Sequence, residues 1–259
     1  MNEIQRLQMN MLIRLDEVCH RHGLRYYLAY GTCIGAMRHQ GFIPWDHDVD
    51  VLMPVQDAKK LPQYQEEFGD RYFVTSFRTD PTYKSIAMRI VDREHRCRET
   101  QDGKVTEEMF VAMDIYPFYN CPKSQIALTL QVWRSHVYKM LVGGAPKNHG
   151  TLMKLAANLI LLFHPKKNRE RDIARLEAKL DYRGESDSIA DYYGRDITVC
   201  NAITYRKEWF AEPKRLRFED REFDAPTDPD RYLTTRYGDY MTPPSSQDRE
   251  HELKCELIP

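Results

Sequence analysis

The sequence predicts an α/β protein in which a mixed sheet is flanked by helices. Short runs such as 84–91 are rich in β-favouring apolar residues and have the length of strands. Longer stretches such as 4–18 repeat apolar residues with the period of an amphipathic helix. The 259 residues are 42% hydrophobic and 30% charged, which suits one globular unit with an appended helical part.

Three segments follow from changes of character along the chain. Residues 1–122 hold most of the strand-like runs and an acidic motif, and we expect them to form the main core. Residues 123–183 are predicted to form a helical insertion. Residues 184–259 are rich in Tyr, Asp, Arg and Pro and are predicted to complete the fold and its cleft.

Composition disfavours several functional classes. A net charge of −1 and a pI near 6.8 argue against a general nucleic-acid binder. Six scattered cysteines without a C-x-x-C pair argue against zinc fingers and a dense disulfide frame. The chain starts with a polar amphipathic segment rather than a basic and then apolar signal peptide. A reduced cytoplasm fits these features best.

The first helix is predicted to end at Gly23, after apolar residues at helical spacing: Ile4, Leu7, Met11, Leu15 and Val18. Residues 24–30 predict a strand that leads to Gly31-Thr32 and a helix from Cys33. Glycine lets backbone amides approach a phosphate, and Thr32 and the helix N-terminus add donors and a positive dipole. An ordinary strand-to-helix turn is the alternative.

The residues that close this short helix are Arg38 and His39. They are suited either to binding phosphate or to complementing the helix C-terminus. The sequence leaves both interpretations open.

Asp46, Asp48 and Asp50 place three carboxylates within five residues. Repulsion and desolvation make such a cluster costly unless a cation compensates, so a divalent metal ion is the natural partner. A solvated acidic loop is the competing interpretation. An EF-hand calcium loop is disfavoured because its sixth position requires glycine, and Val51 stands there.

Alternation predicts that this motif lies on a strand. Residues two apart share a face about 7 Å apart, so Asp48 and Asp50 are placed to flank one cation. Val49, Val51 and Met53 then face a core. We therefore expect an acidic strand whose carboxylates line a cleft.

Further strands are predicted at 71–77 and 84–91, with a charged hairpin or loop at 93–104. Lys84 and Arg89 are candidates to neutralise substrate phosphates, and a solvated strand edge is the alternative. Asp114 interrupts an apolar strand, where an unpaired charge is expensive. It is either a buried structural aspartate or a site carboxylate.

Three helices are predicted from 124 to about 180. The apolar stretch 155–163 is too short for the roughly 20 residues of a membrane span. It is either the core of a helical subdomain or an interfacial helix with Lys166, Lys167 and Arg169 near lipid headgroups. Beyond it, 208–226 suggests a small β element, and a helix follows between Asp228 as N-cap and Gly238 as stop.

The segment 31–50, G-T-C-I-G-A-M-R-H-Q-G-F-I-P-W-D-H-D-V-D, resembles the signature of the LicD family, which includes bacterial phosphocholine transferases. Similar landmarks follow at 113–118, M-D-I-Y-P-F, and at 237–244, Y-G-D-Y-M-T-P-P. The resemblance therefore spans most of the chain. One departure is His47, which stands where the family pattern has an acidic residue.

The resemblance implies a nucleotidyltransferase-like fold with residues 1–122 as its catalytic core. It implies that Asp48, Asp50 and Asp114 are catalytic and hold Mg²⁺ or Mn²⁺. A histidine is common near the end of the family's chains. The substrate-binding candidates are accordingly Gly31, Thr32, Arg38, His39, Arg89 and His251.

The family resemblance also implies an activity. Its members move phosphocholine or a polyol phosphate from a CDP-linked donor to a sugar hydroxyl of a cell-surface glycan or a lipid-linked precursor. Two alternatives stay open: transfer of the nucleotide itself, and a non-catalytic module that binds metal or nucleotide. We expect a cytoplasmic protein without a nucleic-acid partner, with peripheral contact at the inner face of the membrane as a further expectation.

Overall fold

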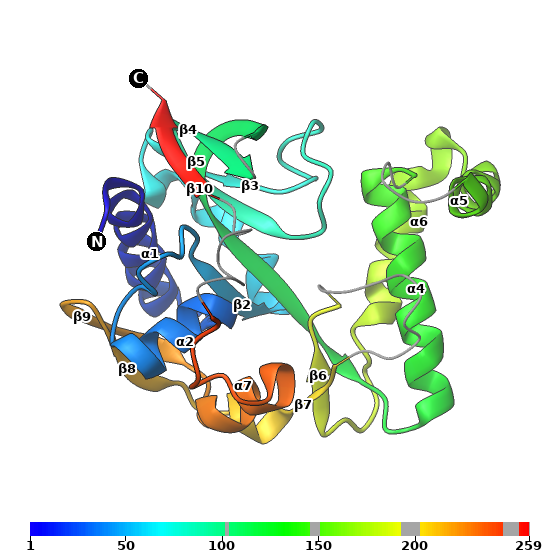
Figure 1. The fold of residues 1–259 in the computed structure, drawn as a ribbon. Helices are drawn as coiled ribbons and strands as arrows, with labels where there is room; N and C mark the ends of the chain where they lie inside the picture. The colour runs from blue at the N-terminus through cyan, green and yellow to red at the C-terminus, as the bar shows by residue number, and fades with distance from the viewer. Residues whose placement is uncertain (102–103, 146–150, 193–202, 246–253, 259) are drawn as a thin grey trace.

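The computed structural model describes residues 1–101, 104–145, 151–192, 203–245 and 254–258, and it confirms a mixed α/β fold (Figure 1). The helices are α1 Glu3–His22, α2 Tyr30–His39, α3 Val55–Ala58, α4 Gln125–Gly143, α5 Thr151–Phe163, α6 Arg169–Leu180 and α7 Pro229–Tyr237. Short 3₁₀ segments cover Leu61–Phe68, Lys166–Asn168 and Lys207–Phe210.

The strands are β1 Tyr27–Leu28, β2 Asp50–Pro54, β3 Tyr72–Thr75, β4 Met88–Gln101, β5 Lys104–Cys121, β6 Ser188–Ala190, β7 Tyr205–Arg206, β8 Lys214–Phe218, β9 Arg221–Ala225 and β10 Lys254–Ile258. The main sheet has the order β1-β2-β5-β4-β10, with β3 on β4, β6 on β5 and β7 on β6. The β2–β5 pair is parallel. Strands β8 and β9 form a separate hairpin.

The long strand β5 connects the two parts of the molecule. Residues 104–115 of β5 pair with β4, residues 114–118 with β2, and residues 119–121 with β6 next to the helical part (Figure 1). Helices α4 to α6 stand together on one side, away from α1 and α2 (Figure 1). A second apolar cluster there includes Val132, Leu141 and Ile173. The domain boundaries at 122 and 183 stay predictions.

Helix α1 forms as predicted and covers the sheet. Asn2 and Gln5 make a reciprocal capping box, and Gly23 ends the helix at φ 62°, a left-handed conformation that glycine adopts without strain. The apolar residues predicted to face the core are buried: Ile4, Leu7, Met11, Leu15 and Val18. Helix α7 also forms as predicted, with Asp228 accepting from the Arg231 amide and Gly238 as its C-cap.

Two local predictions are wrong. The strand at 24–30 shrinks to Tyr27–Leu28, because α2 already begins at Tyr30 rather than Cys33. Of the three clustered aspartates, only Asp50 lies on a strand, and Asp46 and Asp48 lie in the loop before it. The prediction of a charged hairpin or loop at 93–104 is confirmed for its described residues, which continue β4 and β5 as a long hairpin because charged side chains are tolerated on its exposed face.

Candidate active site

Three charged side chains form a row across one face of the sheet. Asp50 on β2 is the register partner of Asp114 on β5, and Asp114 is the register partner of Arg89 on β4. Register partners on neighbouring strands project to the same face. Residues far apart in the sequence therefore meet in one place.

Asp114 and Arg89 form a bidentate ion pair. Arg89 Nε lies 2.6 Å from Asp114 Oδ1, and its Nη2 lies 3.2 Å from Oδ2. Burial raises the pKa of Asp114, and the Arg89 charge and hydrogen bonds only partly oppose this rise. Burial lowers the pKa of Arg89, but the charge and hydrogen bonds of Asp114, together with Tyr83 and Tyr116, outweigh burial, and the pKa lies above its ordinary value. The pair fixes Asp114 at the centre of the row.

Asp50 is the most buried carboxylate of the row. Its residue is 8% exposed, and Oδ1 is buried without a hydrogen-bond partner. Burial and then the charges of Asp48 and Asp114 raise its pKa well above the ordinary value. Thr32 Oγ1 accepts a hydrogen bond from the Asp50 amide at 2.8 Å. The predicted turn residue Thr32 therefore holds the backbone of Asp50, through a hydroxyl that is itself buried.

The loop carrying Asp46 and Asp48 lies against the start of α2. Burial, followed by the charge of Asp48, raises the pKa of Asp46 to about 8. A Cβ at Gly31 would lie 2.6 Å from Asp46 Oδ2, so a larger residue here would displace the Asp46 carboxylate. Gly31 lies in the first turn of α2, where free backbone amides and the helix dipole favour negative charge.

Two buried glutamines of α1 hold the acidic loop in place. Gln5 Nε2 donates to the Asp46 carbonyl at 2.8 Å, and Gln8 Nε2 donates to the His47 carbonyl at 2.8 Å. Gln8 also donates to the Ala112 carbonyl on β5 at 3.1 Å. Neither glutamine is among the predicted site residues, although a polar position on the apolar face of a helix is the signal that identifies them.

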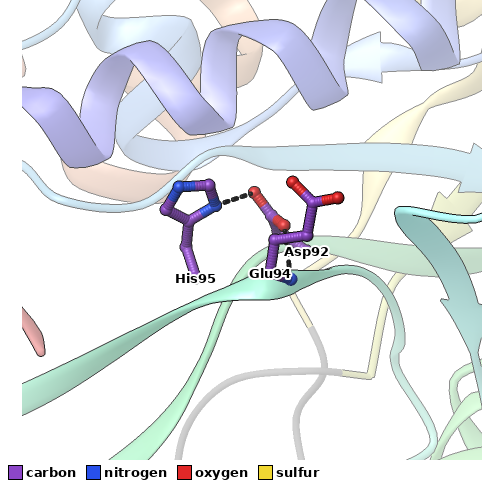
Figure 2. A group of neighbouring side chains, drawn as sticks. All are labelled: Asp92, Glu94 and His95. Atoms are coloured by element: carbon purple, nitrogen blue, oxygen red, sulfur yellow. Dashed lines mark hydrogen bonds and ion pairs between the residues drawn. The ribbon is translucent and has the colours of Figure 1, made fainter. Parts of the chain in front are cut away.

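Among the described residues, one group of three metal-ligating side chains has its donor atoms within 4.8 Å of one another: Asp92, Glu94 and His95 (Figure 2). They lie at the β-bulge of β4. Arg71 Nη2 lies 2.7 Å from Asp92 Oδ2, and its Nε lies 3.5 Å from Glu94. Because the Arg71 guanidinium already pairs with both carboxylates of this group, we assign no metal to it.

The predicted ligands Asp48, Asp50 and Asp114 do not reach that mutual distance in the described structure. Like charges repel, and Asp114 is drawn to Arg89. The donor set nevertheless fits a hard divalent cation, because all its donors are carboxylate oxygens. The buried Asp50 Oδ1 without a partner is the atom for which a cation would compensate.

A groove of about 440 Å³ lies beside Arg89 on the same face of the sheet. Its lining includes Phe73, Tyr83, Arg93 and Phe110. The Arg93 guanidinium lies 4.1 Å from the centre of the Phe73 ring. Cationic and aromatic groups therefore border the row of charged residues, and they suit a ligand with a phosphate and a hydroxylated or ring-shaped part.

The other predicted site residues are not all at this row. Arg38 and His39 lie in the last turn of α2, at the opposite end of that helix from Gly31. Arg38 donates to the Tyr240 carbonyl at 2.8 Å, so it ties α2 to the segment after α7. His251 lies outside the described residues.

Arg236 on α7 is a nearby cation that sequence analysis missed. Its guanidinium stacks 4.2 Å from the ring centre of Tyr30, the first residue of α2. It also lies 3.5 Å from Asp191 and donates to the Tyr205 hydroxyl at 2.9 Å. The sequence signal is weak, because an arginine near a helix end is usually solvated.

Comparison with known proteins agrees with this geometry. The model of the LicD/FKTN/FKRP nucleotidyltransferase domain matches residues 23–140. This range contains α2, the acidic loop and strands β2, β4 and β5, and therefore the whole row of charged residues.

Two characterised relatives are similar to the chain. It is 26% identical to the lipopolysaccharide cholinephosphotransferase LicD of Haemophilus influenzae, over 100% of this chain and 98% of that protein. It is 27% identical over 115 residues to the human ribitol 5-phosphate transferase FKRP, which is 44% of this chain and 20% of FKRP. The resemblance predicted from the motifs is confirmed.

Proposed function

Because this chain carries a LicD-type nucleotidyltransferase domain, we propose that it is a transferase of a phospho-substituent to a glycan. The finer proposal is transfer of phosphocholine or a polyol phosphate from a CDP-linked donor to a sugar hydroxyl. The observation that carries it is the row of Asp50, Asp114 and Arg89, in which Asp50 Oδ1 is buried without a partner. The cytoplasm stays our predicted location for the reaction.

Asp48, Asp50 and Asp114 are the residues that would hold Mg²⁺ or Mn²⁺. When bound, such an ion neutralises the diphosphate and stabilises the departing CMP. Without the ion, the aspartates face one another with Arg89 as the cation of the row. This imbalance of charge is the reason for proposing a cation there.

The chain's own groups supply positioning and a base. Asp114, fixed by Arg89, orients the acceptor hydroxyl and takes its proton. The acceptor oxygen forms a bond to the transferred phosphorus, and the bond from that phosphorus to the oxygen of CMP breaks. The amides of the first turn of α2, at Gly31, bind phosphate oxygens.

A thermal-shift panel tests the proposal. The protein is melted with CDP-choline, CDP-ribitol, CDP-glycerol, CTP or CMP, each with and without Mn²⁺, because a ligand that binds the native state raises the melting temperature. We expect a metal-dependent shift with one CDP compound that Asp50→Asn abolishes and the exposed control Asp220→Asn retains. A shift with CTP alone points instead to nucleotide transfer, and no shift with any nucleotide contradicts the proposed donor class.

A further inference from the structure

Charge is segregated along this chain. Residues 122–169 contain Lys or Arg at eight positions (123, 134, 139, 147, 154, 166, 167 and 169) and no Asp or Glu. The whole chain has 38 basic and 39 acidic residues, so the 30 basic and 39 acidic residues outside this segment give a net charge of −9. The basic segment spans α4 and α5.

Helix α5 exposes large apolar side chains along one stripe. Leu155, Leu159 and Leu162 are 62%, 57% and 76% exposed, and Phe163 is 77% exposed. Their spacing of four, three and one residues puts them on one face of the helix. Ala157, on the opposite face, is buried. The helix is therefore packed on one side and apolar toward solvent on the other.

Helix α4 carries a second stripe of the same spacing. Ile126, Leu130 and Trp133 are 77%, 51% and 53% exposed. A monomeric soluble protein rarely leaves several large apolar side chains exposed together. Such a surface therefore marks a site that contacts a membrane or another molecule. No helix in the described part of the chain is long and apolar enough to cross a bilayer.

We infer that α5 lies in the surface of an anionic membrane, with its leucine face among the acyl chains and the surrounding lysines at the headgroups. The apolar stripe and the acid-free, basic segment that carries it are the two features of an interfacial helix. Lys154 and Lys167 are exposed next to the stripe and free to reach lipid phosphates. A second protein copy would place this basic segment against itself, which its charge disfavours.

The inference extends the proposed function, since a membrane-docked transferase suits an acceptor glycan built on a lipid. It does not depend on the identity of the donor. Binding to vesicles is measured without nucleotide, so its failure leaves transfer to a soluble acceptor untouched. Failure of donor turnover equally leaves vesicle binding untouched.

Co-sedimentation with vesicles tests the inference. We expect the protein to sediment with vesicles of phosphatidylglycerol and phosphatidylcholine, and to sediment less with phosphatidylcholine alone or at high salt. Leu159→Glu/Leu162→Glu is expected to weaken binding by at least about tenfold, because two leucines leave the apolar phase. Lys154→Glu/Lys167→Glu is expected to weaken binding only to the anionic vesicles.

The matched control is Val105→Glu/Ile203→Glu, which adds the same charge at apolar residues that are 55% and 41% exposed and lie outside the helical part. It should bind like the wild type. All substituted leucines and lysines are exposed, so circular dichroism and melting temperature should stay unchanged. The inference is overturned if the wild type ignores anionic vesicles or if Leu159→Glu/Leu162→Glu binds normally. Concentration-dependent dimers that this leucine variant abolishes would overturn it in favour of self-association.

Discussion

Asp50 and Asp114 face each other as register partners on the parallel strands β2 and β5, and the second carboxylate is held by Arg89. Two carboxylates at neighbouring positions destabilise a fold unless a cation joins them. The arrangement therefore lowers the stability of the metal-free fold, as expected of a binding or catalytic site.

Asp50→Asn is predicted to stabilise the metal-free protein while abolishing transfer. The substitution removes a buried charge next to Asp48 and Asp114, so the free energy of unfolding should rise by about 1 kcal/mol. Urea unfolding in EDTA measures this change. Added Mn²⁺ should raise the stability of the wild type only. If the variant were less stable than the wild type in EDTA, the carboxylates would not destabilise the fold by repelling one another.

Arg89→Met is predicted to destabilise the fold by about 3 kcal/mol, because it leaves the buried Asp114 carboxylate without its bidentate partner. Replacing both partners, in Arg89→Met/Asp114→Leu, should recover much of that loss. Chemical denaturation of the four proteins of this double-mutant cycle gives the coupling energy. A coupling energy near zero would mean that the pair does not hold the row together.

Gln8→Leu is predicted to lower activity more than its stability loss explains. It removes the bonds to the His47 and Ala112 carbonyls, at a cost of about 1–2 kcal/mol, and frees the acidic loop. The matched control is Gln131→Leu, which also removes a buried glutamine bonded to two carbonyls, of Asn120 and Leu180. Activity assays below the melting temperature should separate the two variants. Equal activity would limit Gln8 to a structural role.

The ion pairs of Glu177 join helix α6 to Lys59 and Arg78, and we expect their contribution to stability to depend on pH. This buried carboxylate of α6 lies 2.8 Å from Lys59 Nζ and 2.9 Å from Arg78 Nη2, beside a cavity of about 400 Å³. Burial raises its pKa, but the Lys59 hydrogen bond and the Arg78 charge outweigh burial, and the pKa lies below its ordinary value.

A lowered pKa in the folded state stabilises the protein above the unfolded pKa, which is about 4.3 for glutamate. This stability is lost as pH falls through the lower pKa of the folded state. Glu177→Gln should therefore be less stable than the wild type at pH 7, and the difference should shrink below about pH 4. Unfolding free energies measured from pH 7 to pH 3 check this. A difference that stays constant with pH would assign its cause to packing.

Much of the fold was predictable because local patterns agree with the tertiary structure. The spacing of Leu7, Met11 and Leu15 predicted α1, and the apolar residues Val51 and Met53 predicted the buried strand β2. Each pattern follows from which face of one element is buried. The LicD resemblance was predictable for another reason, since its motifs are long contiguous segments.

The long-range contacts of the site were not predictable. The residues next to Gln8 in the sequence do not show that its amide reaches the His47 carbonyl. The residues next to Thr32 in the sequence do not show that its hydroxyl accepts from the Asp50 amide. Arg236 reaches Tyr30 through a contact between α7 and α2. Such contacts depend on how elements distant in sequence pack, and periodicity within one element carries no information about that.

The most direct test of the central claim is the product released from CDP-linked donors. Wild type, Asp50→Asn and Asp220→Asn are incubated with CDP-choline, CDP-ribitol or CDP-glycerol, Mn²⁺ and a glycan acceptor, and CMP is quantified. We expect metal-dependent release of CMP from one donor by the wild type and Asp220→Asn, and none by Asp50→Asn. Release of CMP by Asp50→Asn at the wild-type rate, or release of pyrophosphate from CTP in its place, would contradict it.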